Sequence, residues 1–299
     1  MSLSPTFFIV GAPKAGTTAL HSFLDHHPQV VMSEDKEPNY FSWQEIESQA
    51  LYYKKQNIKT EKEYLALFQE KSGAVISGEA SVSYLFYPSV AQRIKNFCPE
   101  AKIIISLREP VARALSHYQM DYSLGLVKFK LEDIWKNEAG HPVTGLYHQQ
   151  YFQISDYLPQ VKQYLNVFPR QQIHFFLHED LIAEREKAIH KICDFLGIEV
   201  NHKQSELEQR NVTLSGKNKI VSSLYANQRF RQILSSLFNE KQKSKVRSLF
   251  FSKAKLPALT PEFRNQLHLK YANSLQELSG ITGLNLDNWK TDTSFQPYK

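Results

Sequence analysis

The sequence predicts an α/β fold, a parallel sheet flanked by helices with a P-loop-like nucleotide site, on three observations. Apolar runs of strand length occur at Phe7–Val10 and Lys102–Leu107, among others. Segments with helical periodicity separate these runs, which is the pattern of parallel strands covered on both faces. A glycine-bounded loop, Gly11–Gly16, joins the first run to the first helical segment. Such a strand–loop–helix unit indicates an anion site at the start of the sheet.

The elements follow in chain order. Strands are predicted at 7–10, 30–32, 75–76, 102–107 and 173–177. Helices are predicted at 17–25, 42–72, 88–97, 111–122, 147–168 and 185–196, the last ended by Gly197, and further helices reach about Ser279. The region between the helix at 111–122 and Gly145 is predicted to be irregular. With no internal repeat and no long linker, residues 1–299 are expected to form a single domain.

Amino-acid composition and net charge exclude several classes of protein. The 299 residues are 42% hydrophobic, and 36 Lys+Arg against 30 Asp+Glu give a net charge of +6. This composition excludes disordered and collagen-like chains, and the modest, unclustered charge fits a small anionic ligand better than nucleic acid. The only cysteines, Cys98 and Cys193, form no CxxC pair, so a disulfide framework and a thiolate zinc site are not expected.

The same chain shows no targeting segment. Its first apolar run, Phe7–Val10, is four residues long, whereas a signal peptide needs roughly 7–15 apolar residues and a membrane span roughly 18. We therefore expect a soluble, cytoplasmic protein with no stable membrane insertion.

The loop after the first strand carries most of the functional information. Backbone N–H groups and the following helix N-terminus converge there, Lys14 adds a full positive charge, and Thr17 and Thr18 add hydroxyl donors. The ATP-binding pattern GxxxxGK[ST] fits in its glycine spacing, from Gly11 to Gly16. However, Thr17 stands where that pattern has lysine. The loop therefore indicates a phosphate-bearing ligand that is held differently from ATP with Mg²⁺.

Two motifs resemble those of sulfotransferases that use 3′-phosphoadenosine 5′-phosphosulfate (PAPS) and release 3′-phosphoadenosine 5′-phosphate (PAP). The first resembles the family's 5′-phosphosulfate loop and consists of Pro13, Lys14, Ala15, Gly16, Thr17 and Thr18. The second runs from Arg108 to Tyr118 after a strand and resembles the family's RxPxxRxxSxY motif. The resemblance implies that Arg108 and Ser116 hold the 3′-phosphate. Arg113 and Tyr118 are interpreted as ion-pairing and packing residues.

Further segments extend the resemblance over most of the chain. Residues 210–219 resemble a basic loop that closes over the nucleotide, which implies cofactor contacts from Lys217 and Lys219. Glu37-Pro38-Asn39-Tyr40-Phe41 resembles the ExxFF segment of the carbohydrate (heparan-sulfate-like) and bacterial branch, whose glutamate is the general base. The resemblance thus implies Lys14 and Glu37 as catalytic residues, and no metal is expected.

One position departs from the carbohydrate branch. Where that branch often has Glu-Lys, this chain has Glu79-Ala80, so the lysine that would contact a sulfated sugar is missing. Glu79 is expected either to line the site or to pair with a buried base.

The predicted reaction is in-line transfer of a sulfuryl group from PAPS to an acceptor hydroxyl or amine. Positioning and neutralisation of the leaving group should dominate, as in phosphoryl transfer. The acceptor is left open among small molecules, carbohydrates, lipids and carrier-bound groups. The alternatives are a P-loop small-molecule kinase and a non-catalytic nucleotide-binding module.

Overall fold

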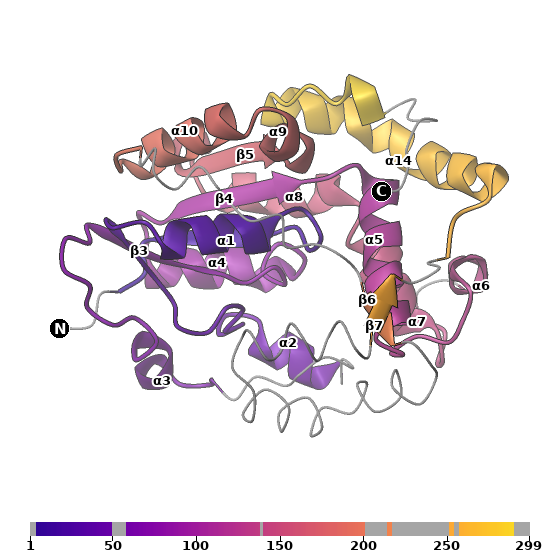
Figure 1. Ribbon diagram of the computed structural model, residues 1–299, viewed down its shortest axis with the longest axis horizontal. Helices are drawn as coiled ribbons and strands as arrows, with labels where there is room; N and C mark the ends of the chain where they lie inside the picture. The colour runs from indigo at the N-terminus through magenta and orange to yellow at the C-terminus, as the bar shows by residue number, and fades with distance from the viewer. Residues whose placement is uncertain are drawn as a thin grey trace.

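The computed structural model describes residues 4–49, 58–137, 140–200, 214–216, 251–253 and 257–289. Within them, five strands form one parallel sheet in the order β2-β3-β1-β4-β5 (Figure 1). Their bounds are β1 Phe7–Gly11, β2 Val30–Met32, β3 Ile76–Ala80, β4 Lys102–Leu107 and β5 Ile173–Leu177. The predicted parallel sheet flanked by helices is confirmed.

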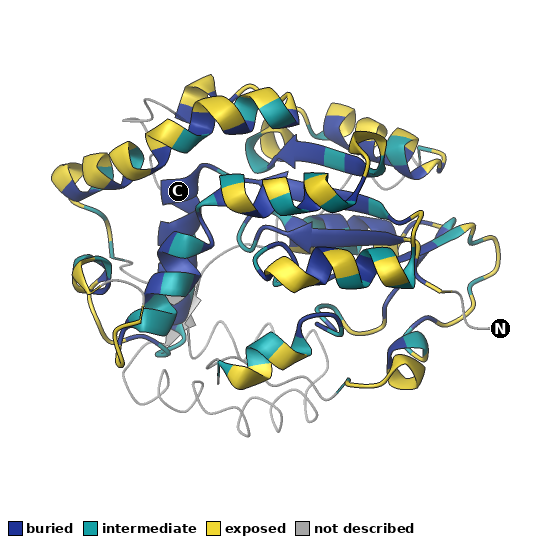
Figure 2. Cartoon of the chain, turned by 180° about the vertical axis from the view of Figure 1, so that it is seen from behind, coloured by how far each residue is buried: buried dark blue, intermediate teal, exposed yellow. Residues whose placement is uncertain are grey.

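Helices cover both faces of this sheet because the side chains of its strands alternate between the faces. Phe7 and Ile9 pack on one face with α1 (Thr17–Asp25) and α10 (Arg185–Leu196). Phe8 and Val10 pack on the other face with α4 (Pro88–Phe97) and α8 (Tyr157–Val167). Figure 2 shows the consequence: the strands are buried, and the helices expose only their outer faces.

A further cluster forms beside the sheet around α5 (Pro110–Ser123). Glu109 begins this helix by accepting hydrogen bonds from the amides of Val111 and Ala112, which is a helix N-cap. The cluster joins α5 to α6 (Leu131–Lys136) and to α14 (Pro261–Thr282). Helix α6 lies in the region predicted to be irregular, so that prediction is wrong over six residues.

The predicted helix 147–168 is divided in the structure. It consists of α7 (Gly145–His148), a π-helical turn at Gln149–Gln153, and α8, which begins only at Tyr157. The cause is the buried Arg113 guanidinium, which donates to the carbonyl oxygens of Gln150 and Tyr151 at 2.8 and 2.7 Å. These bonds stabilise a local departure from α-helical hydrogen bonding.

Smaller elements complete the described fold. In the described part of the predicted helix 42–72, the structure has α2 (Trp43–Ser48) and α3 (Glu61–Leu65), whose start is fixed by a capping box between Thr60 and Glu63. Residues 50–57 lie outside the described residues. Elements that the sequence did not predict are α9 (His178–Ala183), the 3₁₀ turns Arg170–Gln172 and Asp287–Trp289, and the antiparallel pair β6 (Leu214–Gly216) and β7 (Phe251–Lys253). None of the helices in the described ranges is both long enough and apolar enough to cross a membrane.

Candidate active site

The candidate site lies at the carboxyl edge of the sheet, around β1. The chain places β2 and β3 on one side of β1 and then β4 and β5 on the other. Ligands of open α/β sheets bind at such a reversal of strand order. The loops that follow β1, β2 and β4 carry most of the residues that the sequence singles out.

The phosphate loop, residues 11–16, is held in place by β4 and the residue after it. The Ala12 amide donates to the Ser106 carbonyl oxygen at 2.7 Å, and the Ser106 hydroxyl donates to the Ala15 carbonyl oxygen. The Arg108 guanidinium donates to the Lys14 carbonyl oxygen at 3.0 Å. The structure therefore brings Lys14 and Arg108 together, although they are 94 residues apart in the sequence.

The loop has a left-handed backbone at two positions. Lys14 has φ 70° and Gly16 has φ 82°. A Cβ atom at Gly16 would lie 2.7 Å from Nδ1 of His178, so only glycine fits. Gly16 is the N-cap residue of α1, and no side chain accepts a hydrogen bond from the amides of the first helical turn. A bound anion could accept from these amides without displacing a side chain. Thr17 is buried and Thr18 is exposed at this helix start.

The loop is electropositive. Burial, together with the neighbouring Arg108, lowers the pKa of Lys14 to about 8, while Asp121 and Glu37 oppose the shift. Neither Lys14 nor Arg108 lies within ion-pair distance of a carboxylate in the described part of the chain. Within the described ranges, the hydrogen bond of the Lys14 ammonium goes to the thioether of Met120, at 3.4 Å. The proximity of Lys14 and Arg108, with Arg108 lowering the pKa of Lys14, fits a site for a bound polyanion.

His178 adds no charge to the loop. Burial, with Arg108 and Lys14 nearby, lowers its pKa to about 4, so the ring is neutral at physiological pH. The His178 ring packs against Gly16 and leaves no space for a side chain there.

Glu37 lies in the loop between β2 and α2. Its amide donates to the Ala80 carbonyl oxygen at 3.0 Å, at the end of β3, and its carboxylate pairs with Lys36. Its side chain is 37% exposed, so solvent and an acceptor can reach it. Glu37 is the last of the charges that act on the Lys14 pKa and raises it, so the Glu37 carboxylate lies within electrostatic range of the Lys14 ammonium.

Backbone strain marks the same two residues. In the described ranges, the non-glycine residues with positive φ are Lys14, Glu37 (φ 63°) and Asn39 (φ 53°). Such conformations cost of order 1–3 kcal/mol each and cluster at functional sites. The strain therefore supports a functional role for the two loops that hold Lys14 and Glu37.

The remaining predicted residues are placed as follows. Pro13 is half-buried and Ala15 is buried in the phosphate loop, while Ser116 is half-buried on α5, the helix that begins two residues after Arg108. Lys217, Lys219 and the preceding 210–213 segment lie outside the described residues.

Sequence reasoning missed a buried polar row on α5. Arg113, His117 and Asp121 follow one another at intervals of four residues, and all three are buried. Asp121 accepts from the Tyr151 hydroxyl at 2.8 Å and counteracts the lowering of the Lys14 pKa. The signal was present in the sequence as charged residues on a helix face that is otherwise apolar. Arg113 is buried, which fits the predicted packing role, and its guanidinium donates to Ser155 and to the carbonyl oxygens of Gln150 and Tyr151.

Glu79 has a role that neither sequence expectation describes. Its fully buried carboxylate accepts from three hydroxyl groups, those of Tyr64 at 2.6 Å, Tyr84 at 2.9 Å and Ser81 at 2.9 Å. Burial raises its pKa to about 7, and the three hydroxyls oppose this shift. The partners are hydroxyls, so no buried base pairs with it in the described structure.

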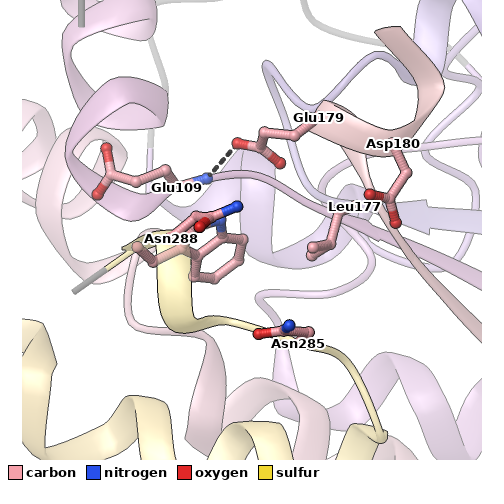
Figure 3. A pocket seen from close by; sticks show the side chains of 7 residues that line it. Glu109, Leu177, Glu179, Asp180, Asn285 and Asn288 are labelled. Atoms are coloured by element: carbon pink, nitrogen blue, oxygen red, sulfur yellow. Dashed lines mark hydrogen bonds between the residues drawn. The ribbon is translucent and has the colours of Figure 1, made fainter. Parts of the chain in front are cut away.

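A separate cavity of about 200 Å³ lies past the ends of β4 and β5. Figure 3 shows its acidic lining, with the Glu109 amide donating to Glu179 at 2.9 Å and with Asp180 nearby. Burial raises the pKa of Glu109 to about 7. The acidic lining makes this cavity unsuited to a nucleotide, in contrast to the Lys14 loop. No cluster of metal-ligating side chains occurs among the residues that the structure describes.

Comparison with known proteins identifies the family and the fold. A family model described as the sulfotransferase domain matches residues 4–279. A sulfotransferase from Alicyclobacillus acidocaldarius superposes with a TM-score of 0.69 and is 26% identical, over 97% of this chain and 100% of that one.

Two further relatives are longer than this chain, which covers only part of each. The membrane-associated sulfotransferase kil1 of Dictyostelium discoideum is 25% identical over 79% of this chain and 64% of its own. Heparan sulfate glucosamine 3-O-sulfotransferase 6 of Mus musculus is 28% identical over 65% of this chain and 52% of its own. The chain thus spans about half to two thirds of these relatives.

Proposed function

Because this chain belongs to the sulfotransferase domain family, we propose that it transfers a sulfuryl group from PAPS to an acceptor hydroxyl or amine and releases PAP. The observation that carries this proposal is the convergence of Lys14 and Arg108 at one loop without a carboxylate partner in the described residues. PAPS bears anionic groups at both its 5′ and 3′ positions, and two cations can neutralise them separately. Family membership also argues against the kinase and the non-catalytic module.

The phosphate loop supplies the 5′ side of this site. Pro13, Ala15, Gly16, Thr17 and Thr18 would hold the phosphosulfate through the backbone and the two hydroxyls. The Lys14 ammonium would stabilise the negative charge that develops on the bridging oxygen when the sulfur–oxygen bond breaks.

The 3′ side is assigned to the end of β4 and the helix that follows. Arg108 presents a guanidinium there, which can hold a phosphate through two parallel hydrogen bonds, and Ser116 adds a hydroxyl. Lys217 and Lys219 are proposed as further contacts by family resemblance.

Glu37 is proposed as the general base. The acceptor oxygen forms a bond to sulfur, the sulfur–oxygen bond to the 5′-phosphate breaks, and the acceptor proton passes to the Glu37 carboxylate. The partial exposure of Glu37 and its electrostatic interaction with Lys14 support this role. The protein groups at this site would perform the transfer without a metal.

The acceptor class is proposed to be a carbohydrate or a small alcohol. One relative is named for heparan sulfate glucosamine, which supports a carbohydrate acceptor. Lipid and carrier-bound acceptors are included in the assay that tests this proposal. A panel of desulfated heparan, N-acetylglucosamine, 4-nitrophenol, octanol and a carrier-bound β-hydroxyacyl chain, each with [³⁵S]PAPS, separates the classes.

We further propose that residues 1–299 form one domain in a reducing, cytoplasmic setting. The family model spans most of the chain, which supports one domain. The free thiols of Cys98 and Cys193 support the setting.

Ligand-dependent thermal stability tests the nucleotide assignment. PAP at about 100 times its Kd should stabilise the protein by about 2.7 kcal/mol and raise the Tm accordingly. ATP with Mg²⁺ at the same concentration should give the smaller shift. A larger shift with ATP and Mg²⁺ than with PAP would contradict the proposal.

A further inference from the structure

We infer that Glu79 is a positioning residue that orients Glu37 through two hydroxyl-mediated hydrogen-bond chains. The chains end on the backbone of the base segment, defined here as residues 37–42. This inference rests on the proposed role of Glu37 as general base. Glu79 itself is fully buried at the end of β3, and nothing in the inference requires it to touch a substrate.

The first chain passes through Ser81. The Asn39 amide donates to Oγ of Ser81 at 3.1 Å, and the Ser81 hydroxyl donates to Oε2 of Glu79 at 2.9 Å. Ser81 is completely buried, so water does not compete for these bonds.

The second chain passes through Tyr84. The Phe41 amide donates to the Tyr84 hydroxyl oxygen at 3.2 Å, and that hydroxyl donates to Oε1 of Glu79 at 2.9 Å. One carboxylate therefore holds two amides of the base segment, two residues apart, through its two oxygens.

Hydrogen bonds of the Asn39 side chain connect the base segment to Glu37. The Asn39 side-chain amide donates to the Glu37 carbonyl oxygen at 2.7 Å, and Ser83 donates to the Asn39 side-chain oxygen at 2.6 Å. Both Glu37 and Asn39 have left-handed backbone conformations, which persist only where surrounding bonds impose them. The two chains from Glu79 supply such bonds.

The direction of each bond explains why a carboxylate is needed. Above its pKa of about 7 the Glu79 carboxylate is ionised and only accepts, and each hydroxyl has a single proton to donate. Once Ser81 and Tyr84 donate to Glu79, their oxygens can only accept, and the backbone amides of Asn39 and Phe41 are the donors that they meet. A glutamine at position 79 would present an NH₂ group to one hydroxyl and disturb that chain.

Tyr64 provides a matched control. Its hydroxyl donates to Oε1 of Glu79, the same oxygen that accepts from Tyr84, and both tyrosines are fully buried. Among the described residues, the Tyr64 hydroxyl makes no second bond to the base segment. Tyr64→Phe and Tyr84→Phe each remove one buried hydroxyl from Glu79 and keep the ring, but only Tyr84→Phe cuts a chain.

Two measurements on the full chain test the inference. Amide hydrogen exchange, resolved by NMR, should be about tenfold faster at Phe41 in Tyr84→Phe and unchanged there in Tyr64→Phe. Sulfate transfer from [³⁵S]PAPS to the best acceptor of the panel should show kcat reduced about tenfold in Tyr84→Phe, with the KM for PAPS and the kcat of Tyr64→Phe within about twofold of the wild type. Equal effects of the two substitutions on exchange and on kcat would overturn the inference.

The controls separate this inference from the proposed function. In a Glu37→Gln background, Tyr84→Phe should cause no further loss of kcat, because the chain acts through Glu37. If Glu37→Gln alone left kcat unchanged, the proposed base would be wrong, while the exchange comparison would still decide whether the chains hold the segment. If Tyr84→Phe did not fold, Ser81→Ala, with exchange read at Asn39, would carry the same comparison.

Discussion

Raising the pH from 7 to 9 should weaken PAP binding because Lys14 loses its proton in this range. The ammonium is favoured for binding the 5′-phosphate, and its pKa in the free protein is about 8. The protonated fraction falls from about nine tenths at pH 7 to about one tenth at pH 9, so the apparent Kd should rise about tenfold. The phosphates contribute no such change, because their second pKa lies near 6.

The sign follows from the direction of the shift. Burial and Arg108 lower the pKa of Lys14 in the free protein, whereas a bound phosphate would raise it. Binding therefore takes up a proton when the pH exceeds about 8, and affinity falls with increasing pH through that value.

Isothermal titration with PAP at pH 7, 8 and 9 and constant ionic strength measures this effect. Lys14→Arg keeps its charge throughout the range and should show a nearly constant Kd. Lys14→Ala should bind weakly at every pH, also without the dependence. Glu79 and Glu109 also have pKa values of about 7. Any effect of their titration on the Kd would be the same in the wild type and in both Lys14 variants, so the comparison isolates Lys14. An unchanged wild-type Kd between pH 7 and 9, or the same tenfold rise in Lys14→Ala, would refute the reasoning.

Four further outcomes follow from the site. Glu37→Gln should lower kcat by about 10²–10⁴ with the Kd for PAP unchanged, as measured by sulfate transfer and titration; near-normal turnover would exclude Glu37 as the base. Arg108→Ala should weaken PAP far more than adenosine 5′-phosphate in the same titration, and equal losses would make Arg108 structural. Gly16→Ala should destabilise the protein by about 1–3 kcal/mol and impair PAP binding, because its Cβ would lie 2.7 Å from the His178 ring; a Tm equal to that of the wild type would contradict this geometry. Treatment with EDTA should leave the transfer rate unchanged, and loss of activity that Mg²⁺ restores would point to a metal-dependent reaction.

The parallel sheet could be predicted because its signals are local. Short apolar runs such as Ile103–Ile105 are fully buried, and Gly197 ends α10 in the left-handed conformation that its sequence position suggested. The phosphate loop was equally visible, since its glycines and lysine are contiguous in the sequence.

Features set by distant contacts could not be predicted. The division of the 147–168 segment depends on Arg113, which reaches the backbone of Gln150 and Tyr151 from another helix. Helical periodicity continues through that segment and gives no sign of the interruption. Likewise, the three hydroxyl partners of Glu79 become neighbours only when α3 and the loop after β3 pack together. The site roles of Lys14, Glu37, Arg108, Ser116, Lys217 and Lys219 stay predictions until they are measured.

The most direct test of sulfuryl transfer by this chain is the fate of the label in [³⁵S]PAPS incubated with the purified protein and the acceptor panel. The account predicts that one acceptor becomes labelled, that one PAP forms for each sulfate transferred, and that Lys14→Ala lowers the rate by about 10²–10³ while its Tm stays close to that of the wild type. If no acceptor, water included, took up the label while PAP still bound, the chain would be a nucleotide-binding module. If Lys14→Ala retained more than about a tenth of the wild-type rate, the proposed chemistry at the phosphate loop would be contradicted.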